Sequence, residues 1–186
     1  MDSDNKMQTN VTTPSDSEMA LQLYQQAITH LNNNELDKAE EILIEFSNKH
    51  PDLAGPAANL GLIQLKRNNI EQAEVLLNKA LESNPKLPQA LNLLGVVQQK
   101  KGNIKQAEKL YLQAIQEKNN YAIAHYNLAL LYDIFLGKIS TAIIHYQRYL
   151  ELIDDQDRQT SNWLKELQYT MESNDSWYFG NSSLHA

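Results

Sequence analysis

The chain has 186 residues, of which 42% are apolar, and its formal net charge is −7. This length is enough for one domain with a substantial buried core. The acidic balance argues against non-specific nucleic-acid binding, which needs clustered lysines and arginines. No apolar run approaches the roughly 18 residues that a membrane span requires. Cysteine is absent, so disulfides and thiol catalysis are excluded.

The N-terminal residues 1–17 carry no apolar periodicity and are predicted to form a disordered tail. The tail is acidic and has no apolar stretch of the kind a signal peptide carries, which favours a cytoplasmic protein. A periplasmic protein or a membrane-anchored lipoprotein stays open, because a polar tail also remains after a leader is removed. Ser15 and Glu18 have the spacing of a capping box, which predicts the start of the first helix.

Small residues recur along the chain at a spacing of 34 residues. The first series consists of Ala27, Gly61, Gly95 and Ala129. A second series consists of Ala39, Ala73 and Ala107, with Ala142 one residue late. This period predicts one helix–turn–helix unit copied in tandem. The four copies are expected at about 20–53, 54–87, 88–121 and 122–153, within a repeat region 18–153. The late Ala142 predicts one extra residue in the fourth turn, around Leu136, Gly137 and Lys138.

The small residues have a steric reason. Antiparallel helices that pack in pairs approach to about 8–10 Å. Gly61 and Gly95 stand where a large side chain would hold the two helices apart. A bulky replacement at one of these sites is predicted to destabilise the fold by about 1–3 kcal/mol.

A last helix is predicted over residues 154–172. Asp154 and Asp155 offer its N-cap, and Trp163, Leu164 and Leu167 form its apolar stripe. In a stack of repeats such a helix covers the apolar face that the final pair would leave exposed. Residues 173–186 are predicted to form a C-terminal tail. The aromatic run Trp177, Tyr178 and Phe179 leaves two interpretations open: the tail folds back onto the last helices, or it is an exposed recognition segment.

The repeated unit resembles the tetratricopeptide repeat. The resemblance is carried by Asn-Leu-Gly at 59–61, Leu-Leu-Gly at 93–95, Gln-Ala-Glu at 72–74 and 106–108, and Asn84 followed by Pro85. It covers residues 20–153, and the flanking repeats deviate most from the pattern. It implies an all-α fold: a right-handed solenoid of four helix–turn–helix repeats with a C-terminal capping helix.

The resemblance also implies where a partner would bind. In this family the first helix of each pair lines a concave groove. The candidate groove residues are Tyr24, Ile28, Asn59, Leu62, Lys66, Asn92, Val96, Lys100, Tyr126, Asn127 and Leu130. An asparagine side chain can pair with both the N–H and the C=O of an extended peptide. Asn59, Asn92 and Asn127 are therefore predicted to contact a peptide backbone, while apolar pockets between them accept side chains.

A chaperone-tail adaptor fits poorly. Chaperone-binding members of the family hold a terminal carboxylate with inward Lys, Arg and Asn side chains. Asn59 is in place here, but Tyr24 and Ile28 occupy the positions where the first repeat would need Lys and Asn.

No catalytic constellation is recognised in the sequence. The five histidines do not have the spacing of a metal site, and no glycine-rich phosphate loop follows a strand. We therefore expect no enzyme activity, no cofactor and no metal. The predicted function is that of a non-catalytic adaptor or scaffold, which holds a peptide or helix of another protein. Assembly of a bacterial envelope or secretion complex is one setting for this role. The alternative is a homo-oligomeric structural module that self-associates through the groove or the cap.

Overall fold

A computed structural model describes residues 15–182, and it describes side chains as far as Ser173. The predicted N-terminal tail therefore lies outside the described residues, apart from its last three. The described chain divides into two compact units, one ending at His50 and the other beginning at Pro51. Each unit is considered by itself.

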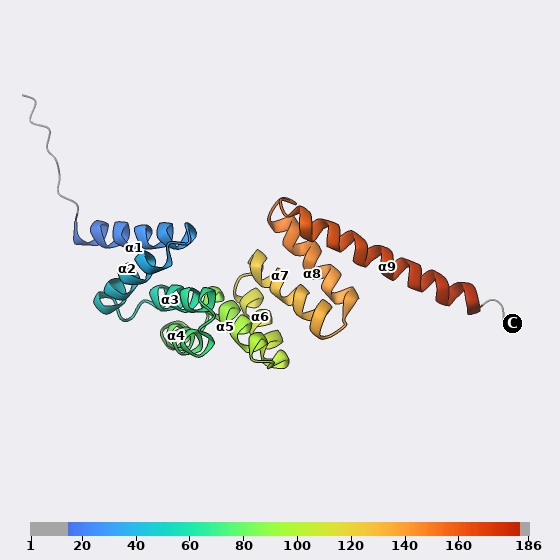
Figure 1. Cartoon of the computed structure of the whole chain (residues 1–186), viewed down its shortest axis with the longest axis horizontal. Coiled ribbons are helices and arrows are strands. Elements are labelled where there is room, and N and C mark those ends of the chain that lie inside the picture. Colours follow the sequence, from blue (N-terminus) through green and yellow to red (C-terminus); the bar gives the residue numbers. More distant parts are fainter. Residues whose placement is uncertain (1–14, 183–186) are drawn as a thin grey trace, which may run out of the picture. The chain divides into compact units, whose positions relative to one another are not determined.

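The described residues form helices and turns, with no strand among them, as predicted. Figure 1 shows the elements in chain order. Their bounds are α1 Asp16–Asn32, α2 Leu36–Lys49, α3 Ala54–Lys66, α4 Ile70–Ser83, α5 Pro88–Lys100, α6 Ile104–Glu117, α7 Ala122–Leu130, η1 Leu131–Phe135, α8 Ile139–Leu152 and α9 Arg158–Ser182.

The first unit is the helix pair α1 and α2. Ser15 is the N-cap of α1 and forms the predicted capping box: its N–H donates to the Glu18 carboxylate at 2.7 Å, and its Oγ accepts from the Glu18 N–H. Ala27 and Leu43 are fully buried between the two helices. These two residues stand 34 positions before Gly61 and Leu77 of the next helix pair.

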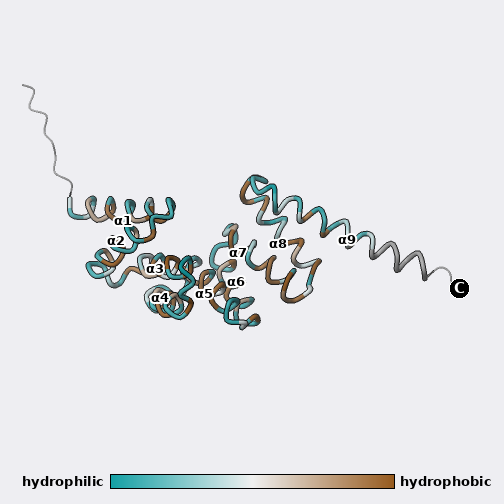
Figure 2. Tube along the Cα trace, viewed as in Figure 1, coloured by the Kyte–Doolittle hydropathy of each residue, from teal (hydrophilic) through white to brown (hydrophobic). Residues whose placement is uncertain are grey.

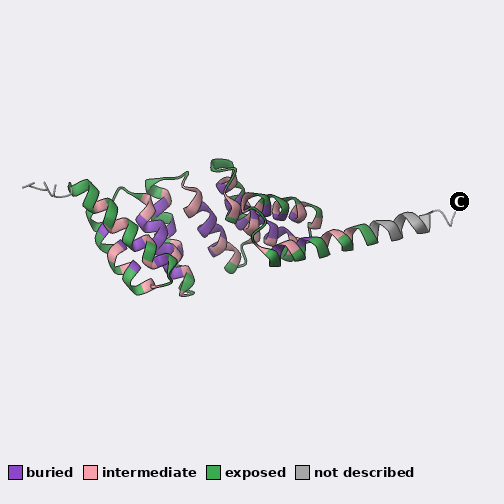
Figure 3. Cartoon of the chain, turned by 90° about the horizontal axis from the view of Figure 1, so that it is seen from above, coloured by how far each residue is buried: buried purple, intermediate pink, exposed green. Residues whose placement is uncertain are grey.

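The second unit stacks three further helix pairs and then α9. Each first helix packs on its own second helix, and each second helix packs on the next first helix. Two clusters of buried side chains run through α3 to α9, and Ile115 packs against both. Figure 2 shows apolar residues recurring along α3 to α8, and Figure 3 shows that the coloured part of the long last helix is mostly exposed or half-buried, as residues 158–173 of α9 are.

The glycines of α3 and α5 mark the closest helix contacts. A Cβ placed on Gly61 would lie 2.7 Å from Leu77 Cγ, and one on Gly95 would lie 2.5 Å from Tyr111 Cε1. Both distances are shorter than van der Waals contact allows, so a side chain at either site must push the second helix away. Tyr111 is a rigid, fully buried ring, and it can yield less than the flexible Leu77.

The turns inside the helix pairs share one backbone conformation. Each has three residues, and the middle one has a positive φ: Asn34 at 60°, Asn68 at 61°, Gly102 at 81° and Gly137 at 62°. Asparagine and glycine are the residues that tolerate this left-handed conformation best. The first two turns have asparagine and the last two have glycine at this position, because the turn geometry is repeated.

The extra residue of the fourth repeat does not lie in the turn, where it was predicted. The turn 136–138 has the same length, three residues, as the turn 101–103. The residue is instead absorbed in the first helix, where Leu131–Phe135 forms a π-turn and the Leu136 N–H donates to the Leu131 carbonyl. A π-turn adds one residue without breaking the helix. The helix before the turn thus spans 122–135, against 88–100 in the third repeat.

The last helix also begins and ends differently from the prediction. Its first turn is capped by Asp157, whose Oδ1 accepts from the Thr160 N–H at 3.1 Å. Asp154 and Asp155 instead adopt positive φ values of 52° and 54° in the preceding turn, so they cannot serve as the N-cap. Helix α9 continues to Ser182, past the predicted end at residue 172. No proline interrupts that stretch. The side chains of Trp177, Tyr178 and Phe179 lie outside the described residues.

Candidate interaction face and pockets

The first helices of the second unit are joined by side-chain amides. Gln89 Nε2 on α5 donates to Asn59 Oδ1 on α3 at 2.7 Å, and Asn127 Nδ2 on α7 donates to Asn92 Oδ1 on α5 at 2.9 Å. Asn59 and Asn92 are only 4% and 2% exposed. The side chains of these two predicted site residues therefore form hydrogen bonds that link one repeat to the next.

The aliphatic site residues lie on the same helices and are half-buried. Leu62 packs against the core around α3 to α5, and Val96 and Leu130 pack against the core around α6 to α9. Tyr126 turns toward α8, where its ring centroid lies 4.9 Å from that of Tyr149. Tyr126 therefore belongs in part to the packing of the fourth repeat.

The two predicted lysines lie at the ends of their helices and are exposed. Lys66 is the last residue of α3 and Lys100 the last residue of α5. Lys100 Nζ lies 3.4 Å from Asn68 Oδ1 in the turn of the preceding repeat. Each lysine therefore carries its charge near the turn end of its helix.

The remaining site residues, Tyr24 and Ile28, belong to α1 in the first unit, and both are half-buried. The Tyr24 ring centroid lies 5.0 Å from that of Phe46, and Phe46 lies 4.5 Å from the His50 ring. Tyr24 is thus one end of a small aromatic cluster within its own helix pair.

One pocket of the second unit brings predicted residues together. It has a volume of about 440 Å³ and includes Leu62 and Asn92. Its complete lining is Leu62, Leu87, Pro88, Gln89, Asn92, Leu93, Lys118, Tyr121 and Ile123. Such a volume falls within the range of about 300–1,000 Å³ that is usual for ligand pockets. Sequence reasoning missed the part of its wall that comes from the loops before α5 and α7.

The rim of this pocket is positively charged. Lys118 is exposed, and its Nζ lies 5.5 Å from the centroid of the Tyr121 ring. Burial raises the pKa of the Tyr121 hydroxyl, so this tyrosine is neutral at physiological pH. Nearby, Lys86 is balanced by Glu117 at 3.6 Å. The lining contains no acidic side chain, so Lys118 sets the sign of the local potential.

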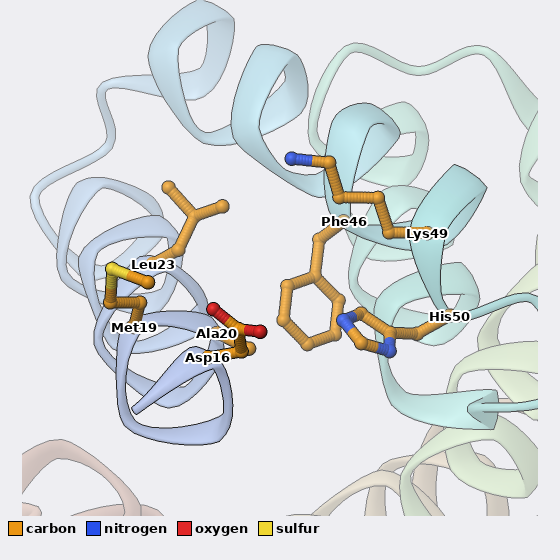
Figure 4. A pocket seen from close by; sticks show the side chains of 7 residues that line it. All are labelled: Asp16, Met19, Ala20, Leu23, Phe46, Lys49 and His50. Atoms are coloured by element: carbon orange, nitrogen blue, oxygen red, sulfur yellow. The ribbon is translucent and has the colours of Figure 1, made fainter. Parts of the chain in front are cut away.

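A second pocket, of about 430 Å³, lies within the first unit between the start of α1 and the end of α2. Figure 4 shows Met19, Leu23 and Asp16 facing Phe46 and His50 across it. None of these residues was predicted as a site. The signal was present only as the apolar spacing of Met19, Leu23 and Phe46, which does not separate core from open surface.

The fourth repeat holds a polar network around the π-turn. Asp133 Oδ2 accepts from Tyr146 OH at 3.2 Å and from Trp163 Nε1 at 2.8 Å. Burial, followed by the nearby Asp133 charge, raises the pKa of Tyr146. Asp133 therefore joins all three helical segments of this region: η1, α8 and α9.

Two histidines face each other in the same repeat. His125 Nδ1 and His145 Nδ1 are 3.0 Å apart, and His125 Nε2 lies 3.1 Å from the Asn119 carbonyl oxygen. That carbonyl needs a proton on His125 Nε2, so His145 Nδ1–H donates to the unprotonated His125 Nδ1. Burial lowers the pKa of His145 to about 4 and also lowers that of His125. Within residues 15–173 no group of three or more metal-binding side chains occurs. The His125 and His145 ring centroids lie 5.2 Å apart.

Among the helices of residues 15–182, none combines the length and the apolar character needed to span a bilayer.

Comparison with models of protein families identifies the family of the chain. Two models described as tetratricopeptide repeat match residues 58–122 and 122–156. The chain belongs to the tetratricopeptide repeat family. Repeats of this family are generally protein-interaction modules without catalytic activity. The comparison with curated proteins gives no match.

Solved structures show the same fold at low sequence identity. PilF of Pseudomonas aeruginosa is 20% identical with a TM-score of 0.73, over 84% of this chain and 71% of that one. TTC0263, a protein of the same family from Thermus thermophilus, is 21% identical with a TM-score of 0.68, over 83% and 84%. MamA is 21% identical with a TM-score of 0.58, over 76% and 82%. These likenesses support the helical-repeat fold.

Proposed function

We propose that this protein is a non-catalytic adaptor that binds an extended peptide or a helix of a partner along α3, α5 and α7. The observation that carries the proposal is the pocket of about 440 Å³, which combines apolar walls with side-chain amides. Apolar walls supply burial, and a few polar groups fix the orientation of a ligand. Gln89 already donates its Nε2 to Asn59, so its carbonyl oxygen remains as an acceptor for a peptide N–H.

The proposal extends to the other half-buried residues of the same helices. Val96, Asn127 and Leu130 continue the surface from α5 onto α7, and Lys66 and Lys100 stand at its edge. Tyr24 and Ile28 are proposed to contribute a corresponding surface in the first unit. The proposed setting is assembly of a bacterial envelope or secretion complex. Its support is the resemblance of residues 127–152 and Trp163 to small bacterial proteins of this family.

The test is partner capture by a groove variant. The double variant Leu62→Glu with Val96→Glu is expected to lose most of the partner recovered by the wild type, because two charges would enter an apolar contact. The wild-type protein and the double variant are each immobilised as bait and incubated with a lysate of the native organism. The captured partner protein is then quantified by mass spectrometry. Circular dichroism checks that the fold persists.

A matched control comes from the second helices. Val75 is 69% exposed on α4 and Leu112 is 43% exposed on α6. Val75→Glu with Leu112→Glu adds the same two charges and should leave capture unchanged. Equal capture by both double variants would contradict the groove.

Self-association is a second candidate, favoured by exposed apolar residues near the cap. Ile134 and Phe135 are 65% and 49% exposed, and Trp163 is 44% exposed. The Trp163 indole is held beside Asp133, next to Ile134 in the chain. Light scattering over a range of concentrations decides this candidate, since a constant monomer mass would reject it.

A further inference from the structure

The pocket that includes Leu62, Asn92 and Lys118 has a chemistry more selective than an apolar groove. Its lining combines aliphatic side chains with the Tyr121 ring and the amides of Gln89 and Asn92, and Leu93 is 9% exposed. Ile123 is 41% exposed at its edge. One side chain of a ligand can therefore be covered by apolar atoms, while its neighbours remain at the surface.

The charge at this pocket is unbalanced. Among the residues that the structure describes, Lys118 takes part in no ion pair, whereas Lys86, Lys101 and Lys138 pair with glutamates of neighbouring helices. The ammonium group of Lys118 lies over the Tyr121 ring at the pocket wall. An aromatic face attracts a cation, so the positive charge is held beside the apolar cavity.

The positive charge of Lys118 contrasts with the chain as a whole, whose formal net charge is −7. A generally acidic surface repels acidic ligands at long range. A single lysine without an acidic neighbour in the lining therefore makes this pocket a local exception. Complementary charges across an interface mainly set which partner is accepted.

We infer that the pocket accepts the apolar side chain of a partner peptide next to an acidic residue. The apolar side chain enters between Leu62, Leu93 and Ile123, and the neighbouring carboxylate pairs with the Lys118 ammonium group. The Gln89 carbonyl oxygen accepts a backbone N–H of the same peptide. This inference rests on the proposed adaptor function and specifies its ligand: an aliphatic or aromatic residue beside Asp or Glu.

The experiment uses a random peptide library displayed on phage and selected on the full-length protein. The selected peptides are expected to share an apolar residue directly beside Asp or Glu. They are then synthesised and titrated against the isotope-labelled protein. Methyl signals of Leu62, Leu93 and Ile123 should shift, which would place the peptide in this pocket.

Two lysine variants isolate the charge. Lys118→Glu is expected to weaken binding of the acidic peptides at least about five-fold, because an attraction becomes a repulsion. The control Lys109→Glu changes an exposed lysine of α6 that does not line the pocket, and it should bind like the wild type. Since both lysines are exposed, melting curves of the two variants should match that of the wild type.

The possible outcomes distinguish a failure of the inferred peptide preference from a failure of the proposed adaptor function. Peptides that bind at Leu62 and Leu93 without an acidic residue, and equally well to Lys118→Glu, would overturn the acidic preference and leave the adaptor function standing. A library that yields no ligand for this face would overturn both. A dimer that dissociates on Lys118→Glu would assign the pocket to a second copy of the chain and overturn the peptide ligand.

Discussion

In the third repeat α5 and α6 are regular helices with a glycine at their contact, whereas in the fourth repeat a π-turn precedes the turn and an alanine takes the place of the glycine. Both repeats bury a tyrosine of the second helix, and both give its hydroxyl an acceptor on the first helix. Tyr111 OH donates to Gln99 Oε1 at 2.9 Å, and Tyr146 OH donates to Asp133 Oδ2 at 3.2 Å.

The difference lies in what else the acceptor does. Gln99 is bonded to one tyrosine, while Asp133 also accepts from Trp163 of α9. The second repeat has Leu77 in place of the tyrosine and Leu65 in place of the acceptor. A polar residue near the end of the first helix thus accompanies a tyrosine in the second helix. Steric fit dominates the third repeat, and polar bonding ties the fourth to the cap.

The largest effect is expected from Gly95→Leu in the third repeat. The new side chain would collide with the rigid Tyr111 ring, and overpacking of this kind costs about 1–3 kcal/mol. The melting temperature should fall by several degrees, measured by circular dichroism. Lys105→Ala, at an exposed site of α6, serves as the control. An unchanged melting curve for Gly95→Leu would refute the close contact.

A smaller effect is expected when the acceptors are removed. Asp133→Ala leaves the buried Tyr146 hydroxyl without its acceptor, and losing the partner of a buried group costs about 1–3 kcal/mol. The Trp163 side chain is 44% exposed, so its N–H can bond to water instead, and we expect a total cost toward the lower end of that range. Gln99→Ala removes one bond and should cost less, while Asp133→Asn keeps an acceptor oxygen and should lie between. Urea unfolding gives the free energies.

Fluorescence adds a local readout of the same variants. In a Trp177→Phe background Trp163 is the remaining tryptophan of the chain, and its emission should change with Asp133→Ala but not with Gln99→Ala. A larger loss of stability for Gln99→Ala than for Asp133→Ala would reverse the proposed contrast between the two repeats.

The smallest effect is a difference in pH dependence. The facing His125 and His145 have lowered pKa values in the folded state, about 4 for His145. The unfolded chain therefore takes up protons first as the pH falls below about 6.5, so folding stability decreases from there toward pH 4. Protonation of His125 Nδ1 would also set two N–H groups against each other.

The third repeat supplies the matched variant for this prediction. Its corresponding residues are Leu91 and Leu110, both buried. The double variant His125→Leu with His145→Leu should flatten the loss of unfolding free energy between pH 7 and 5, measured in urea at each pH. The same slope in both proteins would show that the histidine pair does not contribute.

The period of the sequence predicts the helix pairs, since the spacing of small residues follows directly from close helix packing. The fourth repeat shows its limit. A shift of Ala142 by one residue reports an insertion between Ala129 and Ala142, but not where it lies. A longer turn and a π-turn can each accommodate one extra residue. The choice between them depends on the contacts of Asp133 with α8 and α9. The period of the sequence does not report these contacts, because they form only when the helices pack.

The site was predictable in part for a related reason. Periodicity places Asn59, Gln89, Asn92 and Asn127 on first helices, but it does not say whether their amides face solvent or one another. The structure pairs them across repeats. Lys118 and Tyr121 escaped prediction because they lie between helices, where the helical period carries no information about direction.

The Asp133 network also bears on how the chain finds its correct arrangement. Repeated units offer similar surfaces, so α9 has alternative docking positions one or two repeats too early while the chain folds. There its Trp163 N–H would meet Leu65, which has no acceptor, or Gln99, whose oxygen already serves Tyr111. Agreement among local contacts favours a single folded state over its near-copies. Asp133 is thus a specific hydrogen-bond acceptor that distinguishes the last repeat from the preceding ones, and it determines where α9 docks and the array ends.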